Sequence, residues 1–374
     1  MGRQKHIILK VILFAYILLS CLLCVGCSDD TLSGLTTIFS STEKSAANDS
    51  VKEGELEVHF IDVGQGDATL IKEGNHAMLI DAGENNQGEV VTEYLKSQKI
   101  TELEYVIGTH PDSDHVGGLD VVIDNYSCKT VIMPEITSDT RTYEDVIKAV
   151  KKNNLSVTDP EPGDTYSLGE ADFTIVAPNR DYGDDTNNWS VGILLTFGKN
   201  RFLFTGDAEA VAEKDMMANG IDLSADVYKA AHHGSKTGSS EVFLDAVNPK
   251  YSVISCGEDN EYGHPSAQTL NEFRKRGIQV FRTDEQGTIV ALSDGLSISF
   301  NMSPDESWKA GEPKGASKNN TSGVRYVINT NTGKFHRPSC KHVDEMKSEN
   351  RKNTSETKSQ LEKRGYIPCG VCKP

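Results

Sequence analysis

The chain has 374 residues, of which 37% are hydrophobic, so it can bury one large core and a second, smaller one. Its formal net charge is −17, with 55 acidic residues against 38 lysines and arginines. This balance argues against a surface that holds nucleic acid by broad cationic contacts, because an acidic field repels phosphates at long range. An anionic substrate would need local positive charge, such as a metal ion, at the site itself.

The N-terminal residues have the character of a targeting segment. A basic "MGRQKH" precedes the apolar "IILKVILFAYILLSCLLCVGC", and polar residues follow at once. The apolar stretch is short for a membrane span, which favours a signal peptide, with an uncleaved anchor as the alternative. "LLCVGC" resembles a bacterial lipobox and would make Cys27 the lipidated residue, while "LLSC", ending at Cys21, is a second candidate. We therefore expect an extracytoplasmic protein, either a membrane-anchored lipoprotein or a secreted one.

Shifts in composition divide the rest of the chain. Two stretches are rich in polar and charged residues with little apolar periodicity, which is typical of flexible linkers. We predict a leader at 1–27, a linker at 28–54, a large domain at 55–302, a second linker at 303–323 and a small C-terminal module at 324–374.

Within the large domain, short apolar runs typical of strands alternate with helical patterns. Helices are expected at 88–98 and 267–276, and another can begin within 115–123. This order predicts an α/β domain, and hairpin-like strand pairs favour a mixed sheet or two stacked sheets over a purely parallel one. The expected strands lie at 55–63, 67–74, 76–83, 103–109, 171–178, 191–198, 201–207, 225–231, 250–256, 277–283 and 287–293.

Groups able to bind metal concentrate where these strands end. His110, Asp112, Asp114 and His115 follow the strand at 103–109 directly, in "GTHPDSDHVGGL". Imidazole and carboxylate suit zinc, manganese or iron, and four such groups exceed what a single three-ligand ion needs. Two ions are therefore plausible, while capping of the next helix by the two aspartates is the alternative.

Two further strand ends carry the same residue types. Asp207 ends the run "RFLFTGD", and His232 and His233 follow "VYKAA". Three strand ends that present Asp and His at one sheet edge are what a dinuclear site needs, with one carboxylate bridging the ions. Such a pair of ions can activate water and neutralise charge on a phosphoryl oxygen, an arrangement that phosphodiester hydrolysis exploits. No "GxSxG" nucleophile motif competes with this interpretation.

In this order, "HPDSDH", "TGD" and "HHGS" resemble the motifs of the metallo-β-lactamase hydrolase superfamily. More narrowly, "FIDVGQGDATLI", "LIDAGE", "HHGSKTGSS" and "SCGEDNEYGHPS" resemble the extracytoplasmic hydrolase domain of ComEC-type DNA-uptake proteins, over about residues 55 to 300. The resemblance implies an αββα sandwich. The chain departs from the commoner motif, since Asp112 stands where histidine is usual and no histidine occurs between His115 and His232. This ligand set has more oxygen and less nitrogen, so it favours manganese, with zinc as the alternative metal.

The resemblance also implies roles for single residues. His110 and Asp112 would serve one ion, Asp114 and His115 the other, with Asp207 bridging and His233 completing the set. His232 would be a ligand or a donor to the substrate's phosphate. His264, in "YGHPS", would contact the substrate or act as an acid, unless it is only a structural loop histidine. The residues expected to act in catalysis are Asp114, His232 and His264, and those expected to support the site or the substrate are Asp62, Gln65, Asp67, Asp81, Asn188 and Ser190.

The C-terminal module carries its own set of ligands. "KFHRPSCKHV" and "GYIPCGVCKP" supply His336, Cys340, Cys369 and Cys372. These residues predict structural zinc, because a hydrophobic core this small needs an additional cross-link to be stable. The module is similar to the metal-binding domain of Ada repair proteins, with His336 where that family has cysteine. His342 is a rival ligand, and a disulfide, for instance between Cys369 and Cys372, is the alternative. Frequent lysines and arginines indicate either a nucleic-acid-binding appendage or a solvated face.

Together these patterns predict a surface-tethered hydrolase that uses two manganese or zinc ions and carries one structural zinc. The resemblance to ComEC-type proteins implies that it cleaves phosphodiesters, with DNA as the first-choice substrate. The expected partners are DNA, the membrane through a lipid anchor, and a separate DNA-uptake channel. One alternative is a phosphoester hydrolase that acts on phosphocholine or teichoic-acid groups of the cell wall. Another is a DNA receptor without catalytic activity.

Overall fold

The computed structural model describes residues 54–311 and 326–374, except residues 339, 345, 355, 357 and 373. The leader, with the expected lipidation site Cys27, lies outside the described residues, as does most of the second predicted linker. Within the described ranges, no helix combines the length and apolar character needed to cross a membrane.

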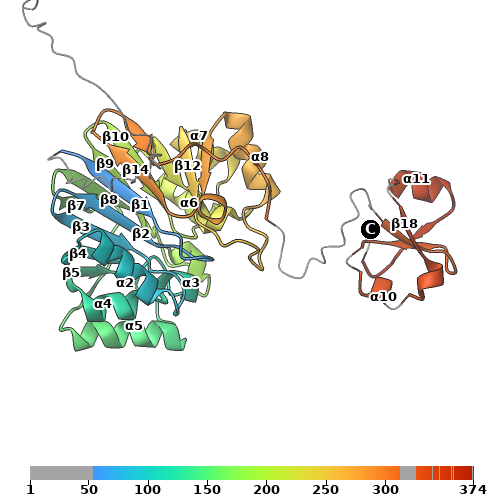
Figure 1. The fold of residues 1–374 in the computed structure, drawn as a ribbon, viewed down its shortest axis with the longest axis horizontal. Helices are drawn as coiled ribbons and strands as arrows, with labels where there is room; N and C mark the ends of the chain where they lie inside the picture. The colour runs from blue at the N-terminus through green and yellow to red at the C-terminus, as the bar shows by residue number, and fades with distance from the viewer. Residues whose placement is uncertain are drawn as a thin grey trace, which may run out of the picture. The chain divides into compact units, whose positions relative to one another are not determined.

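Residues 54–311 build two mixed β-sheets that share one core (Figure 1). The first has the order β15-β14-β1-β2-β3-β4-β5-β6 and the second β13-β12-β11-β10-β9-β8-β7. Strands β3 to β6 are parallel in the first sheet, and β10 to β13 are parallel in the second. The strands of the first sheet are β1 Leu56–Phe60, β2 Thr69–Glu73, β3 His76–Ile80, β4 Glu102–Ile107, β5 Ser127–Ile132, β6 Val157–Thr158, β14 Ile289–Ser293 and β15 Ile298–Phe300. Those of the second are β7 Thr165–Leu168, β8 Ala171–Ala177, β9 Gly192–Phe197, β10 Asn200–Phe204, β11 Val227–Lys229, β12 Tyr251–Ile254 and β13 Gln279–Arg282.

Helices cover the outer face of each sheet. Helices α2, α4 and α5 pack on the first sheet in one apolar cluster, and α6, α7 and α8 pack on the second in another. The four layers are therefore helix, sheet, sheet and helix, and the predicted αββα sandwich is confirmed. The helices are α2 Gly88–Ser97, α3 Ser113–Val116, α4 Leu119–Asn125, α5 Arg141–Lys152, α6 Ala210–Ala218, α7 Glu241–Val247, α8 Ala267–Arg276 and α9 Thr283–Gln286, with short 3₁₀ turns η1 Thr186–Trp189 and η2 Ala231–Gly234.

The alternation of residues along β1 shows why these segments become central strands. Leu56, Val58 and Phe60 point into the core between the sheets. His59 points to the helix layer instead, where its Nδ1 lies 2.8 Å from the hydroxyl of Tyr94 on α2. Both faces of the strand are thus covered, which explains its near-continuous burial.

The predicted helix at 267–276 forms as α8 with the expected boundaries. The hydroxyl of Ser266 accepts a hydrogen bond from the backbone N–H of Thr269, and Gly277 ends the helix with φ at 68°. The first residues after β15 also pack on this domain: the backbone N–H of Asp305 donates to Val280, and Arg274 lies over the ring of Trp308. The polar composition that indicated a linker from residue 303 therefore includes residues with fixed tertiary contacts.

The C-terminal part, described by itself, is a small sheet with the strand order β18-β16-β17-β19. Its two faces carry different clusters: Val327, Cys340 and Cys369 on one, and Phe335 and Leu361 on the other. Its elements are β16 Tyr326–Asn329, β17 Lys334–His336, α10 Lys341–Asp344, η3 Ser348–Asn350, β18 Arg351–Thr354, α11 Lys358–Lys363 and β19 Ile367–Pro368.

Candidate metal centre

The segments that follow β4, β10 and β11 meet at one edge of the sandwich. The turn after β4 carries His110 to His115, the segment after β10 carries Asp207, and η2 after β11 carries His232 and His233. Because β10 and β11 are parallel neighbours, their carboxyl ends deliver Asp207 and the two histidines to the same place. The first sheet contributes the remaining groups from across the core.

Four side-chain groups converge at the centre of this edge. The Nε2 atoms of His115 and His233 lie 3.2 Å apart, and His115 Nε2 lies 3.1 Å from Asp207 Oδ1. His233 Nε2 lies 3.2 Å from Asp114 Oδ2 and 3.5 Å from Asp207 Oδ2. Ligand atoms about 2.0–2.1 Å from a tetrahedral ion are about 3.3 Å from one another, so these separations fit a divalent metal ion.

Hydrogen bonds at the opposite side of each imidazole orient it for such an ion. Nδ1 of His115 lies 2.9 Å from Asp81 Oδ2, and Nδ1 of His233 lies 3.0 Å from the carbonyl oxygen of Ser255. Each ring therefore donates from Nδ1 and turns the lone pair of Nε2 inward. Asp81 is itself fixed, because its two carboxylate oxygens accept from the backbone N–H and the hydroxyl of Thr109.

The charges of the site without metal point to the same conclusion. Burial alone would lower the pKa of His233, but the carboxylates of Asp207 and Asp67 outweigh it and raise this pKa to about 10. Burial also opposes protonation of His115, yet Asp207 and Asp81 raise its pKa well above the ordinary value. Two protonated Nε2 atoms cannot both point across a 3.2 Å contact. One divalent ion would satisfy both nitrogens and the carboxylates together, so these residues fit a metal.

A second set of groups adjoins the first through Asp207. Nε2 of His110 is buried without a hydrogen-bond partner and lies 3.8 Å from Asp112 Oδ2. Nε2 of His232 lies 3.5 Å from Asp207 Oδ2. Burial, and then His115, lower the pKa of His110 to about 4, so its imidazole is neutral as a metal ligand must be. Burial raises the pKa of Asp112, whose side chain is 44% exposed, so this set is more open than the first.

The backbone of η2 is unusual at both histidines. His232 has φ 49° and ψ 49°, and His233 has φ 53° and ψ 28°, so two consecutive residues other than glycine adopt the left-handed conformation. This conformation is costly and is found at functional sites. It allows neighbouring side chains, which a strand would send to opposite faces, to approach Asp207 together.

Asp67 lies beside the centre but has a different principal partner. Its Oδ2 lies 2.6 Å from Nζ of Lys229, and both side chains are nearly buried. Its Oδ1 lies 3.3 Å from Nδ1 of His233, the ring nitrogen that faces away from the converging groups. Although one oxygen of Asp67 falls within the cluster of possible ligands, we assign it to holding His233 and Lys229. The sequence reasoning missed Lys229, whose signal was a lysine inside the apolar run "VYKAA".

The tight contact between two loops brings Asp67 to this place. Gly66 has φ 133°, and a Cβ there would lie 2.3 Å from the carbonyl oxygen of Asp114. The backbone N–H of Asp67 donates to that same oxygen at 3.0 Å. Glycine is thus required in "GQGD", because any side chain would separate this loop from the turn that carries the metal-binding groups.

The other residues expected to support the site have distinct surroundings. Ser190 Oγ accepts from the backbone N–H of Asp207 and lies 3.3 Å from His110 Nδ1, so it adjoins both. Asn188 Oδ1 accepts from the backbone N–H groups of Glu209 and Ala212, at the start of α6, and so positions that helix. Asp112 occupies the N-cap position of α3 without forming a side-chain cap, which weakens the helix-capping alternative.

His264 lies on a loop after β12 and faces the two histidines of η2. Its ring centroid is 5.5 Å from that of His232 and 6.1 Å from that of His233. The side chain is largely buried, and its Nδ1 has no hydrogen-bond partner among the described residues. Asn260 fixes the loop, since its amide accepts from the backbone N–H of His264 and donates to the carbonyl oxygen.

An open cavity of about 640 Å³ borders this loop and the "GQGD" turn. Gln65 lines it, with Oε1 accepting from the backbone N–H of Gly257 and a buried Nε2 that has no described partner. Tyr262 also lines it, with its ring stacked on His264 at 5.6 Å. The lining is acidic, with the carboxylates Asp62, Glu84, Glu258, Asp259, Glu261 and Asp284.

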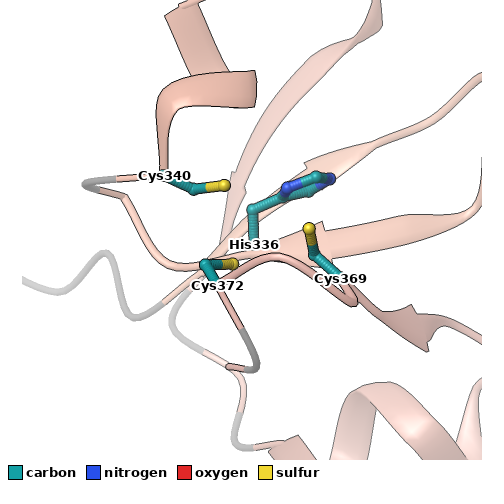
Figure 2. A group of neighbouring side chains, drawn as sticks. All are labelled: His336, Cys340, Cys369 and Cys372. Atoms are coloured by element: carbon teal, nitrogen blue, oxygen red, sulfur yellow. The ribbon is translucent and has the colours of Figure 1, made fainter.

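The C-terminal part brings together the four groups expected to bind zinc. The ligand atoms of His336, Cys340, Cys369 and Cys372 all lie within 4.8 Å of one another, and Figure 2 shows the three sulfur atoms gathered around the imidazole. None of these three cysteines is in a disulfide, and His342 is not one of the four converging residues. The backbone N–H of Arg337 donates to Cys372 Sγ, a contact typical of thiolate sites. A Cys₃His cluster able to hold a metal is therefore present.

The αββα sandwich and its buried Asp/His centre at one edge define a class of protein. The metallo-beta-lactamase superfamily model matches residues 61–258, and the chain belongs to this superfamily.

Among curated proteins, the chain is similar to ComE operon protein 3 of Bacillus subtilis, with 29% identity over 253 residues that cover 63% of this chain and 33% of that protein. Competence protein ComA of Neisseria gonorrhoeae is 31% identical over 252 residues, which cover 66% of this chain and 33% of that protein. Recombination protein 2 of Haemophilus influenzae is 31% identical over 238 residues, 62% of this chain and 28% of that protein. The chain thus spans about a third of the length of these relatives, and it is distantly related to competence proteins.

Proposed function

We propose that the large domain is a metal-dependent phosphodiesterase with two divalent ions, and that its substrate is DNA. The observation that carries the proposal is the convergence of His115, His233, Asp114 and Asp207 at separations that fit one ion, next to the unpartnered Nε2 of His110. The relationship to competence proteins supports DNA as the substrate and DNA uptake as the process.

In this proposal Asp114, His115 and His233 would hold one ion, His110 and Asp112 would hold the other, and Asp207 would serve both. His232 takes the position of a nitrogen ligand for the second ion, because its Nε2 also approaches Asp207. Bound metal would supply the positive charge that activates water and stabilises the phosphoryl oxygens. Asp81 and Ser255 fix the two central rings, and His264 lies where a side chain can contact the substrate or its leaving group.

The test uses residues 52–374, purified without the leader and incubated with labelled single- and double-stranded DNA in manganese, zinc or chelator. We expect metal-dependent cleavage that is lost in Asp112→Ala and Asp207→Ala and retained in the exposed control Asp139→Ala. Metal content is measured for each variant in parallel. Intact DNA in every reaction, with both ions bound, would contradict the proposal.

The acidic cavity beside the centre favours a second candidate, a hydrolase of phosphocholine groups. A quaternary ammonium would be attracted by the cavity's carboxylates and by the ring of Tyr262, which is 57% exposed. A chromogenic phosphocholine ester and bis(p-nitrophenyl) phosphate separate the two. Faster turnover of the choline ester, lost in Tyr262→Ala, would favour cell-wall substrates over DNA.

We further propose that the protein acts outside the cytoplasm as a lipoprotein anchored through Cys27, where it supplies or degrades DNA beside a separate uptake channel. The basic and then apolar leader supports this location. Metabolic labelling with a palmitate analogue, compared between the unmodified chain and Cys27→Ala, tests the anchor. Equal labelling of both chains would argue against lipidation at this residue.

A further inference from the structure

Charge is divided unequally between the two folded parts of the chain. Residues 54–311 carry 44 aspartates and glutamates against 20 lysines and arginines, a net charge of −24. Residues 326–374 carry 10 lysines and arginines against 5 acidic residues, a net charge of +5. A polyanion such as DNA is therefore repelled by the large domain and attracted by the small module.

Strand register places two of these cations on the face that carries the metal-binding cluster. Asn329 on β16 lies opposite both Lys334 on β17 and Arg351 on β18. Residues directly opposite in antiparallel strands point to the same face, and so do residues two positions apart in one strand. His336, two positions after Lys334, is a ligand of the Cys₃His cluster. Lys334, Arg351 and the cluster therefore share one face, which we call the cluster face.

Helix α11 covers part of the opposite face of the sheet, and Lys352 remains exposed on it. Ile328 and Phe335 pack there with Leu361 of α11, and Lys352 lies opposite Ile328 on that side. The cluster face keeps its two basic side chains exposed, and neither has an acidic partner among the described residues. Strands β17 and β18, which carry Lys334 and Arg351, lie on either side of β16, so the backbones of these two strands are about 10 Å apart.

Other exposed residues adjoin the residues of this face in sequence or in strand pairing. Arg337 and Lys341 are exposed and adjoin His336 and Cys340 in sequence. Ile367 on β19 lies beside Lys334 and is 59% exposed. Lys334 and Arg351 can each contact a phosphate group, and such contacts give affinity without base specificity.

We propose that the cluster face of the C-terminal module binds the phosphate backbone of nucleic acid and so captures the substrate for the acidic large domain. This inference rests on the proposed function, because it names the device by which a domain of net charge −24 obtains a polyanionic substrate. His336 and the three cysteines would hold a metal ion that stabilises the sheet, while Lys334 and Arg351 would make the contact with phosphate.

The test measures binding separately from cleavage. Residues 52–374 carrying Asp207→Asn, loaded with zinc, are titrated against fluorescent single-stranded DNA at several salt concentrations. Lys334→Glu with Arg351→Glu is expected to weaken binding at least about tenfold and to reduce the slope of log affinity against log salt by about 1.4, the value for two lost phosphate contacts. The matched control is Lys352→Glu with Lys363→Glu, which removes two cations from the same module without touching the cluster face. Zinc content and circular dichroism establish that both pairs remain folded.

A selective loss in the first pair supports the proposal. An equal loss in both pairs, or tighter binding to phosphatidylglycerol vesicles than to DNA, overturns it in favour of bulk charge or a membrane surface. Hydrolysis of bis(p-nitrophenyl) phosphate by the chain with Asp207 intact keeps the two proposals distinguishable. Hydrolysis without selective binding would support the proposed phosphodiesterase and reject DNA binding by the cluster face. Selective binding without hydrolysis would support binding by the cluster face and reject the phosphodiesterase.

Discussion

Replacement of Lys229 by methionine tests how the site is held together in the absence of substrate. Lys229 Nζ lies 2.6 Å from Asp67 Oδ2, and the two side chains are only 4% and 7% exposed. Methionine keeps most of the volume but leaves the carboxylate of Asp67 buried without its cation. Loss of one partner from a buried ion pair costs about 3–5 kcal/mol, so the free energy of unfolding of the large domain should fall by that amount.

Urea unfolding followed by tryptophan fluorescence measures this change in the large domain alone. The chain has two tryptophans: Trp189 lies in the large domain, and Trp308 packs against it. The double variant Lys229→Met with Asp67→Leu removes both charges and should recover at least about 1–2 kcal/mol of the loss. A cost below about 1 kcal/mol for Lys229→Met, or strictly additive single and double variants, would refute the buried pair.

Substitution of Asp67 distinguishes a role in holding His233 from a role as a metal ligand. If Asp67 holds His233 rather than a metal ion, Asp67→Asn should destabilise the domain while the chain still binds its full complement of metal. Asp114→Asn should instead lower the metal content, because Oδ2 of Asp114 lies 3.2 Å from Nε2 of His233, the nitrogen that would bind metal. Loss of an ion from Asp67→Asn would make Asp67 a ligand.

Three further outcomes follow from the geometry. Asp81→Asn should weaken metal binding about 10- to 100-fold, because it disturbs the acceptor for His115 Nδ1, and an unchanged metal affinity would contradict that role. The hydrogen bond from His59 and the charge of Lys72 outweigh burial and lower the pKa of Glu57 to about 2. Ionised Glu57 should therefore stabilise the domain fully above its ordinary pKa of 4.5, and this contribution should be lost as the pH falls toward 2. Glu57→Gln should reduce the fall in the free energy of unfolding over this pH range by roughly 1–3 kcal/mol. Parallel curves of unfolding free energy against pH for the two chains would contradict this role. Cys369→Ala should abolish zinc binding by the C-terminal module and leave hydrolysis of a small diester intact, and retention of one zinc per chain in the module would be inconsistent with the cluster.

Much of the fold could be predicted because its strands are short apolar runs bounded by turns. The runs "RFLFTGD" and "VYKAA" formed β10 and β11, and their ends brought Asp207, His232 and His233 together. Strand ends converge in any parallel pair, so this part of the centre depended on local pattern and general topology.

Other features depend on contacts that no local pattern reports. The pairing of Asp67 with Lys229 joins residues 162 positions apart in the chain, from a loop of one sheet and a strand of the other. Nδ1 of His233 donates to the backbone carbonyl oxygen of Ser255. Every residue has such a carbonyl, so the amino-acid sequence could not reveal this acceptor. The role of Asn188 at the start of α6 was likewise hidden, because an asparagine near a motif looks the same whether it faces a substrate or a helix.

The distribution of the centre over both sheets bears on how this domain loosens. His110, Asp114 and His115 come from the first sheet, while Asp207, His232 and His233 come from the second. Bound metal would therefore join the two sheets at this edge of the sandwich, outside the apolar core that the sheets share. Metal removal should then release this rim before the core, so that amide hydrogens of η2 and α3 exchange by local opening while those of β1 and β9 still await global unfolding.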